Sequence, residues 1–194
     1  AVPDPLLGNA LAAIASDIDA MFDALLPADG RLIEAMRYAA IGGGKRLRPL
    51  LLTATADMFR VDRDTAVRAG AAVEAIHVYS LMHDDMPCMD EDDLRRGKPT
   101  VHKAFDEATA VLAGDALQTL AFELVAQTGC PDAHRLDLVI ALARAAGARQ
   151  LWLTHFSPSL DNPRQFLKEA RAVFPATVVG LDGMTAALHF RDEE

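Results

Sequence analysis

Cysteines, aromatic residues and long apolar runs are all scarce in this chain of 194 residues. The two cysteines, Cys88 and Cys130, form neither a disulfide framework nor a Cys-x-x-Cys motif, so a reducing compartment is the simpler expectation. Aromatic residues make up only 6% of the chain while alanine is abundant, which favours helices over strands. No apolar run approaches the roughly 20 residues of a transmembrane helix. Residues 1–5 lack the basic-then-apolar layout of a signal peptide, and we therefore expect a cytoplasmic protein without a membrane partner.

Basic residues are outnumbered, because 19 lysines and arginines face 28 acidic residues and the formal net charge is −9. Such a surface would repel the phosphate backbone, so we expect no nucleic-acid partner. Binding of an anionic substrate with the help of a cation remains compatible with this charge. The length suffices for one domain with a substantial core.

Apolar residues recur every three or four positions through most of the chain, which is typical of amphipathic helices. The pattern predicts helices over residues 6–26, 31–41, 50–59, 64–84, 101–128 and 133–148. Beyond residue 149 it predicts strands at 151–154, 177–180 and 184–190, and a helix at 162–174. We therefore expect an all-α domain over residues 1–149 and a short β-α-β-β tail over residues 150–194, the latter of doubtful independent stability.

Six acidic residues lie within the ten residues 84–93, and Arg95 and Arg96 follow directly. Carboxylates crowded in this way repel one another unless a cation neutralises them. A set of oxygen ligands without cysteine or histidine suits Mg²⁺, which completes its shell with waters and phosphates. Arginines grip phosphates through parallel hydrogen bonds, so the segment predicts a site for Mg²⁺ and a diphosphate. The alternative is an acidic surface loop with its own counter-charges.

A second basic segment consists of the glycines at 42–44 followed by Lys45 and Arg48. Glycines before a helix let backbone N–H groups approach an anion, and the helix start adds positive charge. Lys45 and Arg48 share a face if this turn is helical. The segment indicates either a second diphosphate grip or a basic turn on a solvated surface.

Helix 64–84 carries His77, Ser80 and Asp84 on one stripe, which directs His77 toward the acidic segment. Pro87 lacks an N–H and should end or kink this helix within that segment. Tyr79 could wall the space beneath the acids. Ordinary core packing is the alternative for His77 and Tyr79.

Gly114 and Asp115 are unusual in the middle of helix 101–128, since glycine and an unpaired buried acid both destabilise a helix there. Close helix packing beside a polar pocket would explain both residues.

These segments together resemble the trans-isoprenyl diphosphate synthase family, with bacterial farnesyl diphosphate synthases as the nearest likeness. The likeness covers about residues 6–148 and rests on residues 43–49, His77, 84–97 and 113–118, in matching order and spacing. It implies the N-terminal half of an all-α isoprenoid-synthase-type helical bundle, usually a homodimer. It also implies the site residues: Asp84, Asp85 and Asp90 on Mg²⁺; Arg95 on an allylic diphosphate; Gly44, Lys45, Arg48, His77 and Arg96 on isopentenyl diphosphate; and Tyr79 with Ser80 limiting the product to about farnesyl length.

The implied reaction condenses isopentenyl diphosphate with dimethylallyl or geranyl diphosphate. The family has a second aspartate-rich motif, facing the first, which no segment after residue 149 matches. Carboxylates on one side only cannot enclose the Mg²⁺ ions, so we expect these residues alone to have little synthase activity. The alternative is a non-catalytic segment or subunit that binds diphosphate through Mg²⁺.

The tail resembles a different family over about residues 150–190, the C-terminal end of ribonuclease Z. The similar residues are 151–157, 174–177 and 182–184, and His155 matches the last zinc ligand. The other ligands, in an HxHxDH motif, are absent, and one histidine cannot hold a catalytic zinc ion. We therefore expect no nuclease activity.

Overall fold

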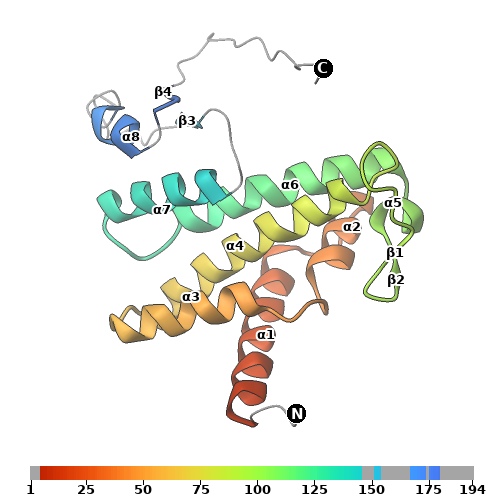
Figure 1. Ribbon diagram of the computed structural model, residues 1–194, viewed down its shortest axis with the longest axis horizontal. Helices are drawn as coiled ribbons and strands as arrows, with labels where there is room; N and C mark the ends of the chain where they lie inside the picture. The colour runs from red at the N-terminus through yellow and green to blue at the C-terminus, as the bar shows by residue number, and fades with distance from the viewer. Residues whose placement is uncertain (1–4, 146–150, 154–166, 174, 180–194) are drawn as a thin grey trace. The chain divides into compact units, whose positions relative to one another are not determined.

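A computed structural model describes residues 5–145, 151–153, 167–173 and 175–179 (Figure 1). The chain divides into two compact units, Ala1–Leu142 and Ala143–Glu194. The first unit is helical, as the sequence pattern predicts. Its helices are α1 (Pro5–Leu25), α2 (Arg31–Ala40), α3 (Leu47–Met58), α4 (Arg63–Asp84), α5 (Val101–Ala104), α6 (Glu107–Ala126) and α7 (Asp132–Ala145), the last of which crosses the division.

Helices α4 and α6 lie side by side at the centre of the first unit (Figure 1). α1 and α3 pack against α4, and α2 packs against α6. The buried face of α4 is rich in alanine and glycine, which lets neighbouring helices approach closely. At Gly70, a Cβ atom would lie 3.3 Å from Cβ of Pro49. α1 contributes Ile14, Ile18 and Phe22 to the core, spaced one turn apart as the apolar periodicity predicts.

The two central helices begin at aspartate caps. The side chain of Asp62 accepts a hydrogen bond from the Thr65 N–H (3.1 Å), and Asp106 accepts one from the Thr109 N–H (2.7 Å). Asp106 itself is extended (φ −167°, ψ 169°), so the chain leaves the helix between α5 and α6. The prediction of one helix over 101–128 is therefore wrong, because the Asp106 cap starts a new helix.

Helix α4 ends at Asp84, in agreement with the expectation that Pro87 stops it. A short antiparallel hairpin follows, formed by β1 (Leu94–Arg95) and β2 (Lys98–Pro99). Its two turn residues, Arg96 and Gly97, both have positive φ (55° and 78°), as the tight two-residue turns of hairpins require. The sequence pattern did not predict this hairpin.

Helix α6 is long and apolar enough to cross a membrane by length and composition alone, in contrast to the expectation that no segment would be. The difference arises because α6 is apolar on average although charged residues interrupt its apolar runs. Seven residues of α6 are buried and the helix packs on α4 and α2, which is the arrangement of a core helix.

Three predicted elements of the second unit are present among its described residues. β3 (Leu151–Leu153) pairs in parallel with β4 (Thr177–Val179), and α8 (Leu167–Val173) precedes β4. The strand predicted at 184–190, residues 162–166 of the predicted helix and His155 lie outside the described residues. The predicted domain boundary near residue 149 also falls there, and the likeness of the tail to ribonuclease Z stays a prediction.

Candidate functional site

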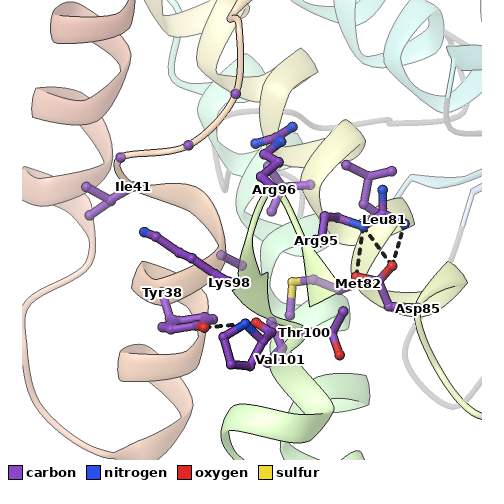
Figure 2. Close-up of a pocket in the computed structure, with 16 residues that line it drawn as sticks. Tyr38, Ile41, Leu81, Met82, Asp85, Arg95, Arg96, Lys98, Thr100 and Val101 are labelled. Carbon is purple, nitrogen blue, oxygen red and sulfur yellow. Dashed lines mark hydrogen bonds and ion pairs between the residues drawn. The ribbon is translucent and has the colours of Figure 1, made fainter. Parts of the chain in front are cut away.

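A pocket of about 180 Å³ lies between the end of α2, the loop at residues 41–44, the last turns of α4 and residues 95–101 (Figure 2). Gly44, Asp85, Arg95 and Arg96 are the predicted site residues that line it. Asp85 and Arg95 face each other on one side, and Arg96 lies toward the loop (Figure 2). The fold therefore brings part of the acidic segment and part of the glycine-rich segment to one cavity, although 40 residues of sequence separate them.

Gly43 and Gly44 form a close-fitting support for the guanidinium of Arg96. A Cβ atom on Gly44 would lie 2.6 Å from Nη1 of Arg96, and one on Gly43 would lie 3.1 Å from it. Gly44 also has φ +88°, a conformation that glycine adopts without strain. These glycines are needed to let an arginine approach their backbone, and Arg96 leaves its guanidinium available to an anion.

Arg46, which the sequence reasoning overlooked, fixes the other end of this loop. Its buried guanidinium donates to Oε1 of Glu74 (2.8 Å), Oδ1 of Asp19 (2.6 Å) and the carbonyl of Ala40 (2.5 Å). Its backbone is left-handed (φ 50°) and forms the N-cap of α3. Lys45 therefore precedes the helix, so the expectation that Lys45 and Arg48 share a helical face is wrong. The periodicity of helix 64–84 offered one signal for Arg46, namely a buried Glu74 that needs a partner.

Four cations of the second basic segment and the hairpin form no ion pair with any described residue: Arg96 and Lys98, which line the pocket, and Lys45 and Arg48, which do not. Lys98 lines the pocket and is opposite Arg95 in the hairpin register, so the two side chains leave the same face of the hairpin. The sequence analysis did not single out Lys98. Unpaired cations around a concave surface are the arrangement that an anionic ligand requires.

His77 lies on the half-buried stripe of α4 that the sequence predicts, together with Ser80 and Asp84. Burial lowers the pKa of His77 below the ordinary 6.5, and the positive charges of Arg48 and Arg96 lower it further, although Glu74 opposes them. The effect of the arginines shows that positive charge from α3 and the hairpin converges on α4 at His77. A neutral His77 can donate a hydrogen bond to an anion and can gain a proton when that anion binds.

The acidic segment is partly neutralised from within. Asp85 is buried and accepts two hydrogen bonds from Nε of Arg95 (2.7 and 2.9 Å), and this pairing raises the pKa of Arg95. Lys103 pairs with Asp93 at 2.8 Å. Oδ2 of Asp92 lies 3.4 Å from Nη2 of Arg95. The three remaining acids, Asp84, Asp90 and Glu91, have no ion pair within the described part of the chain. Internal counter-charges therefore serve only some of the acids, and the alternative of a site for Mg²⁺ and a diphosphate stays a prediction.

The donor chemistry of Asp84, Asp85 and Asp90 fits Mg²⁺, since all three provide carboxylate oxygens. The N–H of Asp90 donates to the carbonyl of Asp84 (2.8 Å), which holds the loop against the helix end. In the described residues, however, no three acidic, histidine or cysteine side chains are gathered at metal-binding distance. Asp85 in particular would have to exchange Arg95 for the metal.

Gly114 of α6 lies against the ring of His83 of α4. A Cβ atom on Gly114 would be 2.2 Å from Nε2 of His83, which confirms the expected close helix packing. The ring of Tyr79 packs edge-on against His83, with centroids 5.6 Å apart. Asp115 is exposed and its carboxylate is 3.9 Å from His83, so the expectation of a buried acid is wrong. Glycine is needed at position 114 because the ring of His83 leaves no space for a Cβ atom, and Asp115 does not require it.

Comparisons with known proteins show the family of this chain. The polyprenyl synthetase family model matches residues 29–151. The chain is 49% identical to farnesyl diphosphate synthase of Haemophilus influenzae over 137 residues, which are 70% of this chain and 46% of that protein. It is 54% identical to farnesyl diphosphate synthase of Escherichia coli over 119 residues, which are 60% of this chain and 40% of that protein.

A solved structure of an FPP/GFPP synthase from Zymomonas mobilis, in an apo form, superposes with a TM-score of 0.70 and 60% identity. The superposition covers 75% of this chain and 54% of that one. The chain therefore spans about half the length of the relatives it matches. Because the family model matches well over half of the chain and the helical fold is shared, this chain belongs to the polyprenyl synthetase family.

Proposed function

We propose that this chain provides the diphosphate-binding half of a short-chain trans-prenyltransferase of the farnesyl diphosphate synthase type. The observation that supports this most directly is the position of Arg96. Its unpaired guanidinium rests on Gly43 and Gly44, next to the Arg95–Asp85 pair in the same pocket. We assign one diphosphate to the cations of this cavity and a second to the side where the Asp85–Arg95 pair of the acidic segment lies.

The allylic diphosphate is assigned to the acidic side. Asp84, Asp85 and Asp90 would hold Mg²⁺, which neutralises charge on the diphosphate and makes it a better leaving group. Arg95 would turn from Asp85 to the diphosphate oxygens and bind two of them in parallel. The Arg95–Asp85 pair keeps both charges neutralised before the substrate and metal arrive.

Isopentenyl diphosphate is assigned to the basic side, on Gly44, Lys45, Arg48, His77 and Arg96. These residues hold its diphosphate so that its double bond faces C1 of the allylic substrate. The C1–O bond to diphosphate breaks, the isopentenyl double bond forms the new C–C bond, and a proton is lost from the isopentenyl unit. The products are a longer allylic diphosphate, free diphosphate and one proton. Positioning and electrostatics supply most of the acceleration.

Tyr79 and Ser80 are proposed to limit the product to about farnesyl length. Both lie on α4 within two turns of the acidic segment, and the contact of Tyr79 with His83 fixes its ring in place. A large residue at this depth shortens the space that a growing prenyl chain can occupy. A homodimer and a cytoplasmic location belong to the same proposal, as expected from the sequence analysis.

Efficient turnover is proposed to need two aspartate-rich motifs on opposite sides of the metal. No segment after residue 149 supplies a second aspartate-rich motif, so the metal cluster would be held from one side only. We propose that the chain by itself binds diphosphates and condenses them slowly.

Isothermal titration calorimetry with isopentenyl diphosphate, with and without Mg²⁺, tests this function. Binding is expected in both conditions, and dimethylallyl diphosphate is expected to need Mg²⁺. Arg96→Gln should remove the first interaction, and Asp84→Asn should remove the second. Absence of binding by either ligand would overturn the proposal. Near-normal turnover in a radiolabelled condensation assay would contradict the assignment of slow condensation.

A further inference from the structure

Arg46 is the most tightly held cation among the described residues. Its side chain is only 1% exposed, and it has ion pairs with Asp19 and Glu74, whose side chains are 31% and 3% exposed. It also donates to the carbonyl of Ala40, so its guanidinium serves three acceptors at once. A planar fork of donors can do this, whereas a lysine ammonium on a flexible stem cannot reach all three.

The three acceptors belong to three different helices. Asp19 lies on α1, Ala40 ends α2 and Glu74 lies on α4 one turn before His77. Asp19 also accepts a hydrogen bond from the N–H of Gly42 at 3.2 Å through its other oxygen. Both ends of the loop at residues 41–46 are therefore fastened to the same buried network.

The loop has several strained or permissive positions that this network holds in place. Gly42, Gly44 and Arg46 all have positive φ (72°, 88° and 50°). For Arg46 this conformation is unfavourable, and residues kept in such conformations concentrate at functional sites. The outer surface of the same loop receives the guanidinium of Arg96.

We propose that Arg46 is a positioning residue that pre-shapes the basic diphosphate site without touching the ligand. Through Asp19 and Glu74 it fixes the loop at 41–46, and the loop in turn places the Gly43–Gly44 support for Arg96 and the start of α3 that carries Arg48. This inference rests on the proposed function, because the ligand in question is isopentenyl diphosphate. Pre-organisation raises affinity by removing the ordering that binding would otherwise require.

The test uses Arg46→Lys, with Arg37→Lys as the matched control. Arg37 also ties two helices through an aspartate and a backbone carbonyl, Asp23 and Leu26. Arg37 itself does not line the pocket, and its side chain has no bond to the loop, so its replacement removes a similar fork without unfastening the loop. Asp19→Asn is the second variant, because it keeps the shape of the network and removes one charge.

Two readouts separate positioning from general destabilisation. In hydrogen exchange of the free protein, Arg46→Lys should speed exchange at residues 41–46, and Arg37→Lys should not. In calorimetry, Arg46→Lys should weaken the binding of isopentenyl diphosphate about tenfold, which corresponds to about 1.4 kcal/mol of binding free energy. Binding of dimethylallyl diphosphate with Mg²⁺ should be unchanged in Arg46→Lys and in Arg37→Lys, because Asp84, Asp85 and Asp90 do not belong to the network.

Equal affinity of Arg46→Lys and wild type for isopentenyl diphosphate would overturn the inference, and so would an equal loss for both ligands. If Arg46→Lys does not fold, Asp19→Asn decides in the same way. If the wild-type chain binds neither diphosphate, the proposed function fails. Hydrogen exchange then still shows whether Arg46 orders the loop.

Discussion

Replacing Gly44 with alanine should disrupt the basic site by moving one arginine. The new Cβ would lie 2.6 Å from Nη1 of Arg96, and 3.0 Å from both Cζ and Nη2. Atoms cannot remain at these distances, so the guanidinium must leave the loop. Alanine would also adopt φ near +88°, which destabilises the fold by about 1–2 kcal/mol.

Gly42→Ala is a closely matched control for this change. Gly42 has φ +72° in the same loop, but a Cβ there meets no atom within 4 Å. Both variants should therefore lose a similar free energy of unfolding in urea, and only Gly44→Ala should displace Arg96. A hydrogen bond to a charged group contributes about 1.5–3 kcal/mol. Losing one predicts roughly 10- to 150-fold weaker binding of isopentenyl diphosphate.

Calorimetry on the two glycine variants and on Arg96→Gln measures this effect. In the Arg96→Gln background, Gly44→Ala should weaken binding no further, because its target is already absent. Equal losses of affinity in Gly42→Ala and Gly44→Ala would refute the reasoning. It would show that loop strain, and not the position of Arg96, determines affinity.

Three further predictions follow from contacts near the pocket. The pKa of His77, followed by NMR of its ring protons, should lie below 6.5 in the free protein and rise when pyrophosphate binds, because the anion offsets the surrounding positive charge. Protonation of His77 should destabilise the free protein as pH falls below about 6.5. A pKa that pyrophosphate leaves unchanged would contradict an anion at this position. Gly114→Ala should lower the free energy of unfolding in urea, because overpacking against His83 costs about 1–3 kcal/mol and helix propensity returns only about 1 kcal/mol. In a His83→Ala background the same change should stabilise the protein. A gain of stability in both backgrounds would be evidence against the contact. Lys98→Gln should weaken the binding of isopentenyl diphosphate severalfold and flatten its salt dependence, because Lys98 lines the pocket. Lys103→Gln is the control and should have little effect, because Lys103 is already paired with Asp93. Similar results for the two lysines would exclude a role for the pocket position.

Local patterns were reliable for the helices and less so where a single side chain interrupts them. The periodicity of α4 and the stop at Pro87 depend on neighbouring residues and were predicted correctly. The break between α5 and α6 was missed because the extended Asp106 cap lies inside an otherwise continuous apolar pattern. The hairpin at 94–99 was missed as well, although Arg96-Gly97 has the residue-then-glycine form of a tight turn.

The sequence by itself determined the helical class, the stripe of α4 that carries His77 and Asp84, and the chemistry of an acidic segment followed by arginines. These properties depend on residue type and spacing along one element. Only the tertiary structure decided that Arg96 rests on Gly43 and Gly44, that Arg46 is the buried member of its segment while Lys45 stays outside, and that Asp85 pairs with Arg95. The physical reason is that each of these contacts joins elements whose separation in space depends on how α1, α2 and α4 pack, which no local pattern encodes.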